Sequence, residues 1–199
     1  MFTGIVTDTS PILSSQTVKD GLLMTIRKPK GWASLKSGDS IATNGVCLTA
    51  AAVRGEEYDC YLMPETLAKT SFGQQLPKSV NLERPLSSQG RFDGHFVQGH
   101  IDQVGKVVSV TDSKDGHCIT IEFGKSNEGL VVAQGSVTVD GVSLTVADVT
   151  NNRLKVCIIP YTCANTTLAK LARGGLVNLE FDILGKYVVK NITLYGGLR

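Results

Sequence analysis

The chain is poor in the residue types that build metal sites and disulfide frameworks. It contains three histidines and five cysteines in 199 residues. No two cysteines form a C-x-x-C pair, and the cysteine count is odd, so we expect free thiols and a reducing, cytoplasmic setting rather than disulfides. Because histidines are so few, a zinc site is not expected, and the sequence predicts no metal.

The chain also lacks strong charge and long apolar runs. Its formal net charge is +2 with no block of basic residues, so no nucleic-acid partner is predicted. No stretch approaches the roughly 18 apolar residues of a membrane span, and the start Met1–Ile5 has no basic region followed by an apolar run, so neither a membrane segment nor a signal peptide is expected. With 42% hydrophobic and 19% charged residues, the chain can form a buried core.

What the sequence does contain is two copies of itself. The paired blocks are Phe2–Asp8 with Val97–Gln103, Asn44–Thr49 with Asp140–Thr145, Leu62–Leu67 with Ile158–Cys163, and Val80–Glu83 with Val177–Glu180. The offset changes only from 95 residues (Gly4 to Gly99) to 97 residues (Val80 to Val177). Each copy is far longer than a solenoid repeat and long enough for a small core. We therefore predict two similar domains in tandem, at residues 1–92 and 93–184, joined near Ser87–Asp93.

The local pattern is mostly strand. Short β-rich segments recur about every ten residues with Gly, Asp, Asn or Ser between them, a spacing typical of small antiparallel barrels or sandwiches. The clearest of these segments are Lys106–Thr111, Cys118–Phe123, Ser136–Val139, Ser143–Val149 and Leu154–Ile159. The dipeptides Asn44-Gly45 and Asp140-Gly141 each lie between two apolar strands, which predicts two tight hairpins.

Helices are a minor part of the prediction. Pro64 and Pro160 suit the first position of short helices over Glu65–Ser71 and Tyr161–Leu171, and Trp32–Lys36 is a third candidate. Near the C-terminus, Leu184, Tyr187, Val188, Ile192 and Tyr195 follow helical spacing, with Gly196-Gly197 as a stop. A helix within residues 185–199 is marginal alone, so we expect it to pack on partner subunits.

With these blocks in view, the chain resembles the α-type riboflavin synthase family over essentially its whole length. Each block is short and weak alone, but together, in order and in duplicate, they are specific. The blocks that carry the resemblance are Met1–Val6, Asn44–Thr49, Glu65–Leu67, Val80–Arg84, Gly94–Asp102, Asp140–Val146 and Asp182–Tyr187. The resemblance implies an all-β fold of two tandem six-stranded Greek-key barrels with short helices and a short C-terminal helix.

The resemblance also implies a reaction. Two molecules of 6,7-dimethyl-8-ribityllumazine exchange a four-carbon unit, without metal or cofactor, and give riboflavin and 5-amino-6-ribitylaminouracil. It further implies a homotrimer in which the N-terminal barrel of one subunit faces the C-terminal barrel of another, and an association with lumazine synthase. Two related pockets suit this reaction because two identical substrates must be held with their reacting carbons adjacent.

Candidate catalytic residues follow from the chemistry and from the family match together. The reaction removes a proton from the 7-methyl group of one lumazine, and His100 is our choice as general acid–base because imidazole titrates near neutral pH. Ser143 and Thr145 lie two apart and share one face of a strand. Asp140 lies beside them, and Cys47 is either a nucleophile or a hydrogen-bond partner.

The predicted substrate contacts fall into two sets. In the first barrel they are Gly4, Ile5, Val6, Cys47, Leu48, Thr49, Tyr61, Leu62, Met63, Pro64, Glu65 and Thr66. In the second barrel they are Gly99, His100, Ile101, Gln134, Ser143, Leu144, Thr145, Ile159, Pro160, Tyr161, Thr162, Cys163 and Ala164. The copies differ at Ile5 against His100, Cys47 against Ser143 and Asn44 against Asp140, so one half has kept tasks that the other lacks.

Several of these residues also have a purely structural interpretation. Cys47 suits a plain buried thiol as well as a catalytic one. Asp140 is a favoured hairpin residue in its own right, and His95 has either a structural role or a supporting role beside the site. Cys60, Cys118 and Cys157 are interpreted as structural thiols. His117 is interpreted as a solvated turn residue.

One departure from the family keeps a second function open. Gln134 stands where the family usually has a lysine, so a cation that could stabilise developing negative charge is missing there. A non-catalytic lumazine- or flavin-binding antenna protein with the same fold is therefore the nearer alternative, although His100, Ser143, Thr145 and Cys47 argue against it. An oligonucleotide-binding pair of barrels is the farther alternative, and it lacks interleaved basic and aromatic residues.

Overall fold

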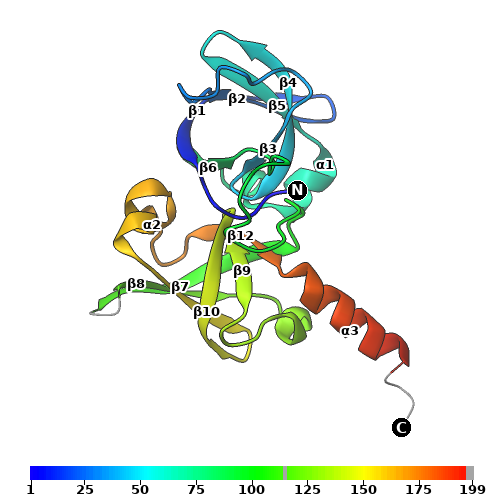
Figure 1. Ribbon diagram of the computed structural model, residues 1–199, viewed down its shortest axis with the longest axis vertical. Helices are drawn as coiled ribbons and strands as arrows, with labels where there is room; N and C mark the ends of the chain where they lie inside the picture. Colours follow the sequence, from blue (N-terminus) through cyan, green and yellow to red (C-terminus); the bar gives the residue numbers. More distant parts are fainter. Residues whose placement is uncertain (114–115, 196–199) are drawn as a thin grey trace.

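The computed structural model describes residues 1–113 and 116–195, and it consists of two closed antiparallel barrels (Figure 1). The first barrel contains β1 (Asp8–Val18), β2 (Gly21–Arg27), β3 (Ser40–Thr43), β4 (Val46–Arg54), β5 (Glu57–Leu62), α1 (Pro64–Lys69), η1 (Ser71–Gly73) and β6 (Ser79–Glu83). The second contains β7 (Gln103–Ser113), β8 (Gly116–Glu122), η2 (Lys125–Leu130), β9 (Ser136–Val139), β10 (Val142–Thr150), β11 (Arg153–Ile158), α2 (Pro160–Asn165), η3 (Leu168–Lys170) and β12 (Leu176–Phe181), and α3 (Ile183–Tyr195) follows it.

Both barrels have the same strand order. The first runs β1-β2-β5-β4-β3-β6 and closes through β1 and β6, and the second repeats this order with β7 to β12. Because β2 pairs with β5 and not with β3, the connection is of the Greek-key kind. Bulges lie at matching places, at Ile12/Ser14 and Val107/Ser109 in the first strands. The predicted pair of six-stranded barrels is confirmed.

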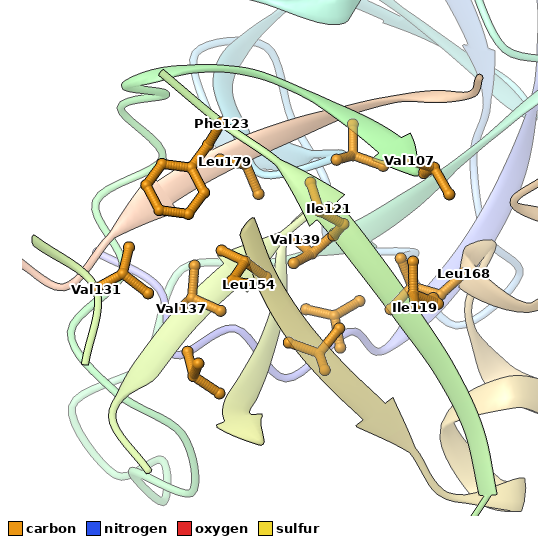
Figure 2. Close-up of a cluster of buried hydrophobic side chains, with 14 of the residues drawn as sticks. Val107, Ile119, Ile121, Phe123, Val131, Val137, Val139, Leu154, Leu168 and Leu179 are labelled. Atoms are coloured by element: carbon orange, nitrogen blue, oxygen red, sulfur yellow. The ribbon is translucent and has the colours of Figure 1, made fainter. Parts of the chain in front are cut away.

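Each barrel is filled by inward-facing apolar side chains. In the second barrel, Val107, Ile119, Ile121, Leu154 and Leu179 are almost completely buried and pack together (Figure 2). Alternation along the strands accounts for this core, since β11 reads exposed, buried, exposed, buried from Arg153 to Val156. Each core also receives a residue from the segment that precedes the other barrel: Val6 packs on the second core and Ile101 on the first.

The two predicted hairpin turns are confirmed, and they meet at the contact between the barrels. Asn44 and Gly45 have φ values of 43° and 79°, and Asp140 and Gly141 have 46° and 80°, as a type I′ turn requires. A Cβ added to Gly141 would lie 2.6 Å from the backbone nitrogen of Gly45, and one added to Gly45 would lie 2.8 Å from that of Gly141. Only glycine therefore allows the turns to approach this closely.

Two asparagines exchange hydrogen bonds across this contact. Asn81 Nδ2, in the first barrel, donates to the Asp140 carbonyl oxygen at 2.9 Å, and Asn178 Nδ2 donates to the Asn44 carbonyl oxygen at 3.0 Å. Their Oδ1 atoms accept from backbone N–H groups of the opposite barrel, Asn81 from Thr167 at 2.7 Å and Asn178 from Ser71 at 2.8 Å. All these groups are buried or partly buried, so losing one partner leaves the other unpaired at a cost of about 1–3 kcal/mol.

Two expectations about local structure are corrected. Trp32–Lys36 forms successive turns, not a helix, with isolated bonds such as Leu35 N–H to the Trp32 carbonyl oxygen. The indole of Trp32 is drawn into the first core and donates to Asp8 Oδ2 at 2.8 Å. His117 lies in β8 opposite Asp112 in β7, and its Nδ1 is 2.7 Å from Asp112 Oδ1, so it is a strand residue with a partner.

The expectation that all cysteines are free thiols is wrong for one pair. Cys118 and Cys157 form a disulfide, with Cα atoms 4.0 Å apart. They are directly opposite in the pairing of β8 with β11, although 39 residues separate them in the chain, so only the strand register brings them together. Cys47, Cys60 and Cys163 are free.

The two short helices are confirmed, with Pro64 and Pro160 as their first residues, but α2 ends at Asn165 and not at Leu171 as predicted. The C-terminal helix α3 begins at Ile183, slightly earlier than the predicted segment, and Asp182 Oδ1 accepts from the Leu184 N–H at 3.0 Å at its start. Its predicted stop at Gly196-Gly197 lies outside the described residues. No described helix has the length and apolar character to span a membrane.

The turn contact leads to a stability prediction. We expect Gly141→Ala to destabilise the protein by about 3 kcal/mol, because a Cβ there adds overpacking against Gly45 to the strain of a positive φ. Gly174→Ala is a matched control: its φ is 89° and no atom lies within 4 Å of the added Cβ. The control should lose only about 1 kcal/mol, from φ strain. Urea unfolding measures both, and equal losses would contradict a close contact between the turns.

Candidate functional site

The first candidate site lies at one end of the first barrel but uses a segment from beyond it. Cys47 lies on β4, and its N–H donates to the Gly99 carbonyl oxygen at 2.9 Å. Gly99 has a φ of 81° and lies so close to Cys47 that a Cβ would come within 2.5 Å of the Cys47 Cβ. His100, which follows Gly99 and is exposed, is thereby held beside the first barrel.

The second candidate site is the mirror of this arrangement. Ser143 lies on β10, and its N–H donates to the Gly4 carbonyl oxygen at 2.8 Å. A Cβ on Gly4, whose φ is 79°, would come within 2.6 Å of the Ser143 Cβ. Gly4, Ile5 and Val6 therefore belong to the site of the second barrel.

The predicted grouping of the site residues is thus corrected. We expected Gly4–Val6 with Cys47 and His100 with Ser143, because each lies in the same half of the sequence. The structure brings His100 together with Cys47 and Gly4–Val6 together with Ser143, because the segment before each barrel crosses to the other one. The crossing segments pair directly, with the Phe2 N–H donating to the Val97 carbonyl oxygen at 2.8 Å and the Val97 N–H donating back at 3.2 Å.

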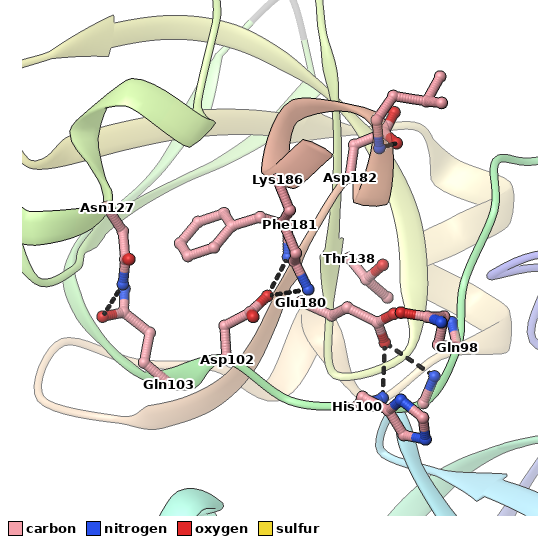
Figure 3. A network of polar contacts seen from close by, with 12 residues as sticks. Gln98, His100, Asp102, Gln103, Asn127, Thr138, Glu180, Phe181, Asp182 and Lys186 are labelled. Carbon is pink, nitrogen blue, oxygen red and sulfur yellow. Dashed lines mark hydrogen bonds and ion pairs between the residues drawn. The ribbon is translucent and has the colours of Figure 1, made fainter. Parts of the chain in front are cut away.

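Two buried glutamates hold the crossing segments in place. Glu180, at the end of β12, accepts from the backbone N–H groups of Gln98, Gly99 and His100 at 2.7, 2.9 and 3.2 Å (Figure 3). Glu83, at the matching place on β6, accepts from the Thr3 and Gly4 N–H groups at 2.7 and 2.9 Å. Burial raises the pKa of both carboxyl groups, and the hydrogen bonds from the backbone act in the opposite direction.

His95, whose role the sequence left open, lies next to Ser143 in the second candidate site. Its ring is buried, with Nδ1 2.7 Å from Ser143 Oγ and Nε2 3.3 Å from Thr138 Oγ1. Burial lowers the pKa of His95, which favours the neutral imidazole at physiological pH. A neutral ring between two hydroxyl groups can orient the Ser143 hydroxyl. In the sequence, the signal for His95 was its position after Gly94, just before the block that contains His100.

Asp140 lies at the contact between the barrels, and no hydrogen bond joins its side chain to His100 or Ser143. Its Oδ1 accepts from the Asn178 N–H at 2.8 Å, just as Asn44 Oδ1 accepts from the Asn81 N–H at 2.7 Å. Burial raises the pKa of Asp140 to about 7. Asn44 and Asp140 therefore have the same structural role, although their side chains differ.

The other predicted contacts lie around the two barrel ends and differ in exposure. The exposed ones are Ile5, Thr49, Tyr61, Met63, Pro64, Glu65, Gln134, Thr145, Ile159, Pro160, Tyr161 and Ala164. The buried or half-buried ones are Leu48, Leu62, Thr66, Ile101, Leu144, Thr162 and Cys163. Large apolar side chains are prominent in the exposed set, with Met63 61%, Ile159 63% and Tyr161 74% exposed. Such exposure is typical of surfaces that a ligand or partner covers.

Two details concern individual predicted contacts. The Tyr61 hydroxyl donates to the Asp20 carbonyl oxygen at 2.6 Å, so the phenol lies along the β1–β2 turn. Gln134 has a φ of 67°, and its N–H donates to the Val146 carbonyl oxygen at 2.8 Å, next to Thr145 on β10. Its amide side chain is exposed and carries no charge.

The two candidate sites of one chain do not face each other. Helix α1 borders the first site and α2 the second, and Figure 1 shows these helices on opposite flanks of the molecule. Among residues 1–113 and 116–195, no cluster of three or more His, Cys, Asp or Glu side chains could hold a metal ion.

Known proteins resemble the chain over both barrels. The lumazine binding domain family model matches residues 3–85 and 98–182. Riboflavin synthase of Actinobacillus pleuropneumoniae is 38% identical over 189 residues, covering 94% of this chain and 88% of that protein. The enzyme of the same name from Mycobacterium bovis is 41% identical over 193 residues, covering 94% and 96%.

The fold is shared with a solved structure as well. LumP complexed with 6,7-dimethyl-8-(1'-D-ribityl) lumazine superposes with a TM-score of 0.80 at 23% identity, covering 91% of this chain and 99% of LumP. LumP complexed with riboflavin gives a TM-score of 0.82 at 24% identity. At such identities the likeness shows the fold alone.

The buried carboxyl group of Asp140 leads to a pH-dependent stability prediction. Its pKa is about 7 in the folded chain against an ordinary value of 3.8, so the folded state holds a proton that the unfolded state loses between these values. The stability from this group is complete below pH 4 and is lost as pH rises through 7, a loss of about 4 kcal/mol. Asp140→Asn keeps the acceptor for Asn178 and removes the charge. We expect the variant to be more stable than the wild type at pH 8 and to lose this advantage at pH 4.

Thermal unfolding between pH 4 and pH 8 measures this difference. Asp148→Asn is the control, because Asp148 is an exposed aspartate on β10. An unchanged pH dependence in Asp140→Asn would show that the carboxyl group is ionised at no cost in the folded protein. Turnover measured on the same samples tests the predicted catalytic role of Asp140 separately from its effect on stability.

Proposed function

The chain belongs to the lumazine-binding domain family, and from this membership we propose that it is a riboflavin synthase. Such an enzyme transfers a four-carbon unit between two molecules of 6,7-dimethyl-8-ribityllumazine and releases riboflavin and 5-amino-6-ribitylaminouracil. The observation that carries the proposal is that relatives of this name match the chain over both barrels, 94% of its length at 38–41% identity. The chain therefore contains both of the domains that such an enzyme has.

Two related sites suit a reaction between two identical molecules. One lumazine must give up a proton from its 7-methyl group, and the carbanion must meet the ring carbon of the other. Holding both rings in this arrangement replaces a bimolecular encounter, and such positioning can lower a barrier by about 7–11 kcal/mol. The Cys47 and Ser143 sites have matching backbone contacts, to Gly99 and Gly4, and this likeness suits two copies of one substrate.

The first site provides the groups for proton transfer. His100 is exposed and free to approach a ligand, while its backbone N–H is held by Glu180 at 3.2 Å. We assign it the removal and return of protons at the 7-methyl group. Cys47 lies in the same site and serves as a hydrogen-bond partner or as a nucleophile toward the ring, and Thr49 points to the same side of β4.

The second site provides the groups that hold the accepting ring. Ser143 and Thr145 lie on one face of β10, and the Ser143 hydroxyl is positioned by His95. A hydroxyl oriented in this way can bind a ring nitrogen or carbonyl oxygen of the lumazine. Gly4 brings its backbone against Ser143, so Ile5 and Val6 can contact the same ring.

A complete active site requires two subunits, since the two sites of one chain are on opposite flanks. Helix α3 supports a homotrimer because most of it carries exposed apolar side chains, with Leu184, Tyr187 and Ile192 60–65% exposed. Lys186 Nζ is 2.7 Å from Asp102 Oδ2 and ties the helix to the start of the second barrel (Figure 3). The resemblance also suggests an association with lumazine synthase and a cytoplasmic location, and of these three the trimer is the one that the surface of this chain supports.

The function is tested by mixing the protein with 6,7-dimethyl-8-ribityllumazine and following riboflavin absorbance. We expect turnover by the wild type and a loss of about 10²-fold or more in His100→Ala, the usual scale for removing a positioned acid–base group. Binding of lumazine, followed by fluorescence titration, should be largely kept. Lys19→Ala, in the exposed turn between β1 and β2, is the control and should leave both unchanged.

Two outcomes would contradict these assignments. A bound yellow chromophore without riboflavin formation by the wild type would indicate an antenna protein, the function that the absence of a lysine at Gln134 favours. Wild-type turnover with an unchanged rate in His100→Ala would move the proton transfer to another group, of which Cys47 is the nearest in the same site.

The shared site leads to a prediction about assembly. Removing residues 187–199 keeps the Lys186–Asp102 ion pair and deletes most of the apolar surface of α3. We expect the mass measured by light scattering to fall from trimer to monomer and riboflavin formation to fall with it, while the circular dichroism of the barrels is kept. An active monomer would disprove the shared site. The substitution Lys190→Ala, on the same helix but without loss of an apolar side chain, is the control.

A further inference from the structure

A cavity lies between the two barrels, apart from both candidate sites. It measures ≈ 440 Å³, and of the residues predicted to act on the substrate only Asp140 lines it. The lining residues are Asn44, Ser71, Gln75, Pro77, Lys78, Ser79, Asp140, Thr167, Lys170, Leu171, Ala172, Gly175 and Leu176. This volume is within the range of small-molecule sites, and a space at a domain interface is a common place for one.

The floor of the cavity carries one free donor and one free acceptor. Asn44 and Asp140 each use Oδ1 to hold the neighbouring strand, at 2.7 and 2.8 Å. Asn44 Nδ2 and Asp140 Oδ2 form no hydrogen bond with any described residue. Both residues line the cavity, although each side chain is largely buried, at 4% exposed. The abutting turns at Gly45 and Gly141 keep these two residues near each other.

The entrance of the cavity is positively charged. Lys78 and Lys170 are exposed at its edge, and neither forms an ion pair with a described residue. Apart from Asp140 on the floor, the other lining residues are uncharged. Two unpaired cations at the mouth of a cavity attract an anionic group.

We propose that this cavity is a second ligand site, for a phosphate ester that carries a cyclic imide ring, as in a uracil or flavin nucleotide. The ring N–H donates to Asp140 Oδ2, and the neighbouring ring carbonyl accepts from Asn44 Nδ2. The apolar side chains of Pro77, Leu171 and Leu176 contact the ring, and the phosphate lies near the two lysines. The site goes beyond the proposed function and does not depend on it.

The difference between the two halves supports this ligand class. A perfect duplication would place the same group at positions 44 and 140, and the floor would offer two like groups. Asn44 and Asp140 instead offer a donor beside an acceptor, which complements a ring edge with an adjacent carbonyl and N–H. Asn44 and Asp140 accept equivalent hydrogen bonds, from Asn81 and Asn178. The fold therefore does not require the two side chains to differ.

Isothermal titration calorimetry tests the proposal with flavin mononucleotide and uridine monophosphate as separate probes. The titrations are done at pH 8, above the pKa of about 7 of Asp140, and the binding assigned to the cavity is the part that the cavity variants lose. We expect at least one nucleotide to bind once per chain, and the arm that binds identifies the ring that the cavity accepts. The double variant Lys78→Glu/Lys170→Glu should weaken this binding by about tenfold or more, since a charge-assisted contact is of that strength.

Two further variants separate the cavity from the rest of the surface. Ala172→Trp fills the cavity from its exposed edge and should abolish binding, while circular dichroism checks the fold. Lys19→Glu, in the turn between β1 and β2 and not in the lining of the cavity, is the control for charge and should bind as the wild type does. The proposal is overturned if neither nucleotide binds, if the cavity variants bind normally, or if inorganic phosphate binds as tightly as both nucleotides. Because no turnover is measured, failure of the riboflavin synthase assay leaves these outcomes interpretable.

Discussion

The exchange of backbone segments between the barrels is the interaction on which the rest of the structure depends. The segment that precedes each barrel reaches across to the other one, and a buried glutamate of its own barrel holds it in place, Glu83 for Thr3–Gly4 and Glu180 for Gln98–His100. A carboxylate in this position satisfies two or three backbone N–H groups that would otherwise be buried without partners. Next to it on the same strand, Asn81 or Asn178 binds the backbone of the opposite barrel. One Asn-Leu-Glu block therefore fixes both the contact between the barrels and the crossing segment.

This exchange makes each candidate site a joint product of both halves. His100 comes from the second copy but stands beside Cys47 of the first, and Ile5 comes from the first copy but stands beside Ser143 of the second. Each candidate site therefore depends on the contact between the two barrels. Helices α1 and α2 lie on opposite flanks of the molecule, which is why the proposed pairing of two substrates is placed between subunits.

The two copies differ in side chains at the candidate sites, but the hydrogen bonds that hold the fold are the same in both. Cys47 and Ser143 have equivalent backbone contacts, but only Ser143 has a buried histidine within hydrogen-bond distance. At Asn44 and Asp140 the structural bond is the same while the free side-chain atom is not. Burying the carboxyl group of Asp140 costs free energy once it is ionised, because desolvation disfavours the charged form.

The sequence by itself determined the duplication, the strand-rich barrels, the two I′ turns, the Pro-initiated helices and the family, because each depends on local pattern or on blocks in a fixed order. It also supplied most of the residues around the sites, though their roles stay predictions. Only the tertiary structure decided that His100 joins Cys47 and not Ser143, that Cys118 meets Cys157, that His95 supports Ser143, and that Asp140 belongs to the contact between the barrels. These are contacts between residues from 39 to about 50 positions apart, or across the two halves. Strand register and the crossing segments set them, and neither leaves a periodic signal in the sequence.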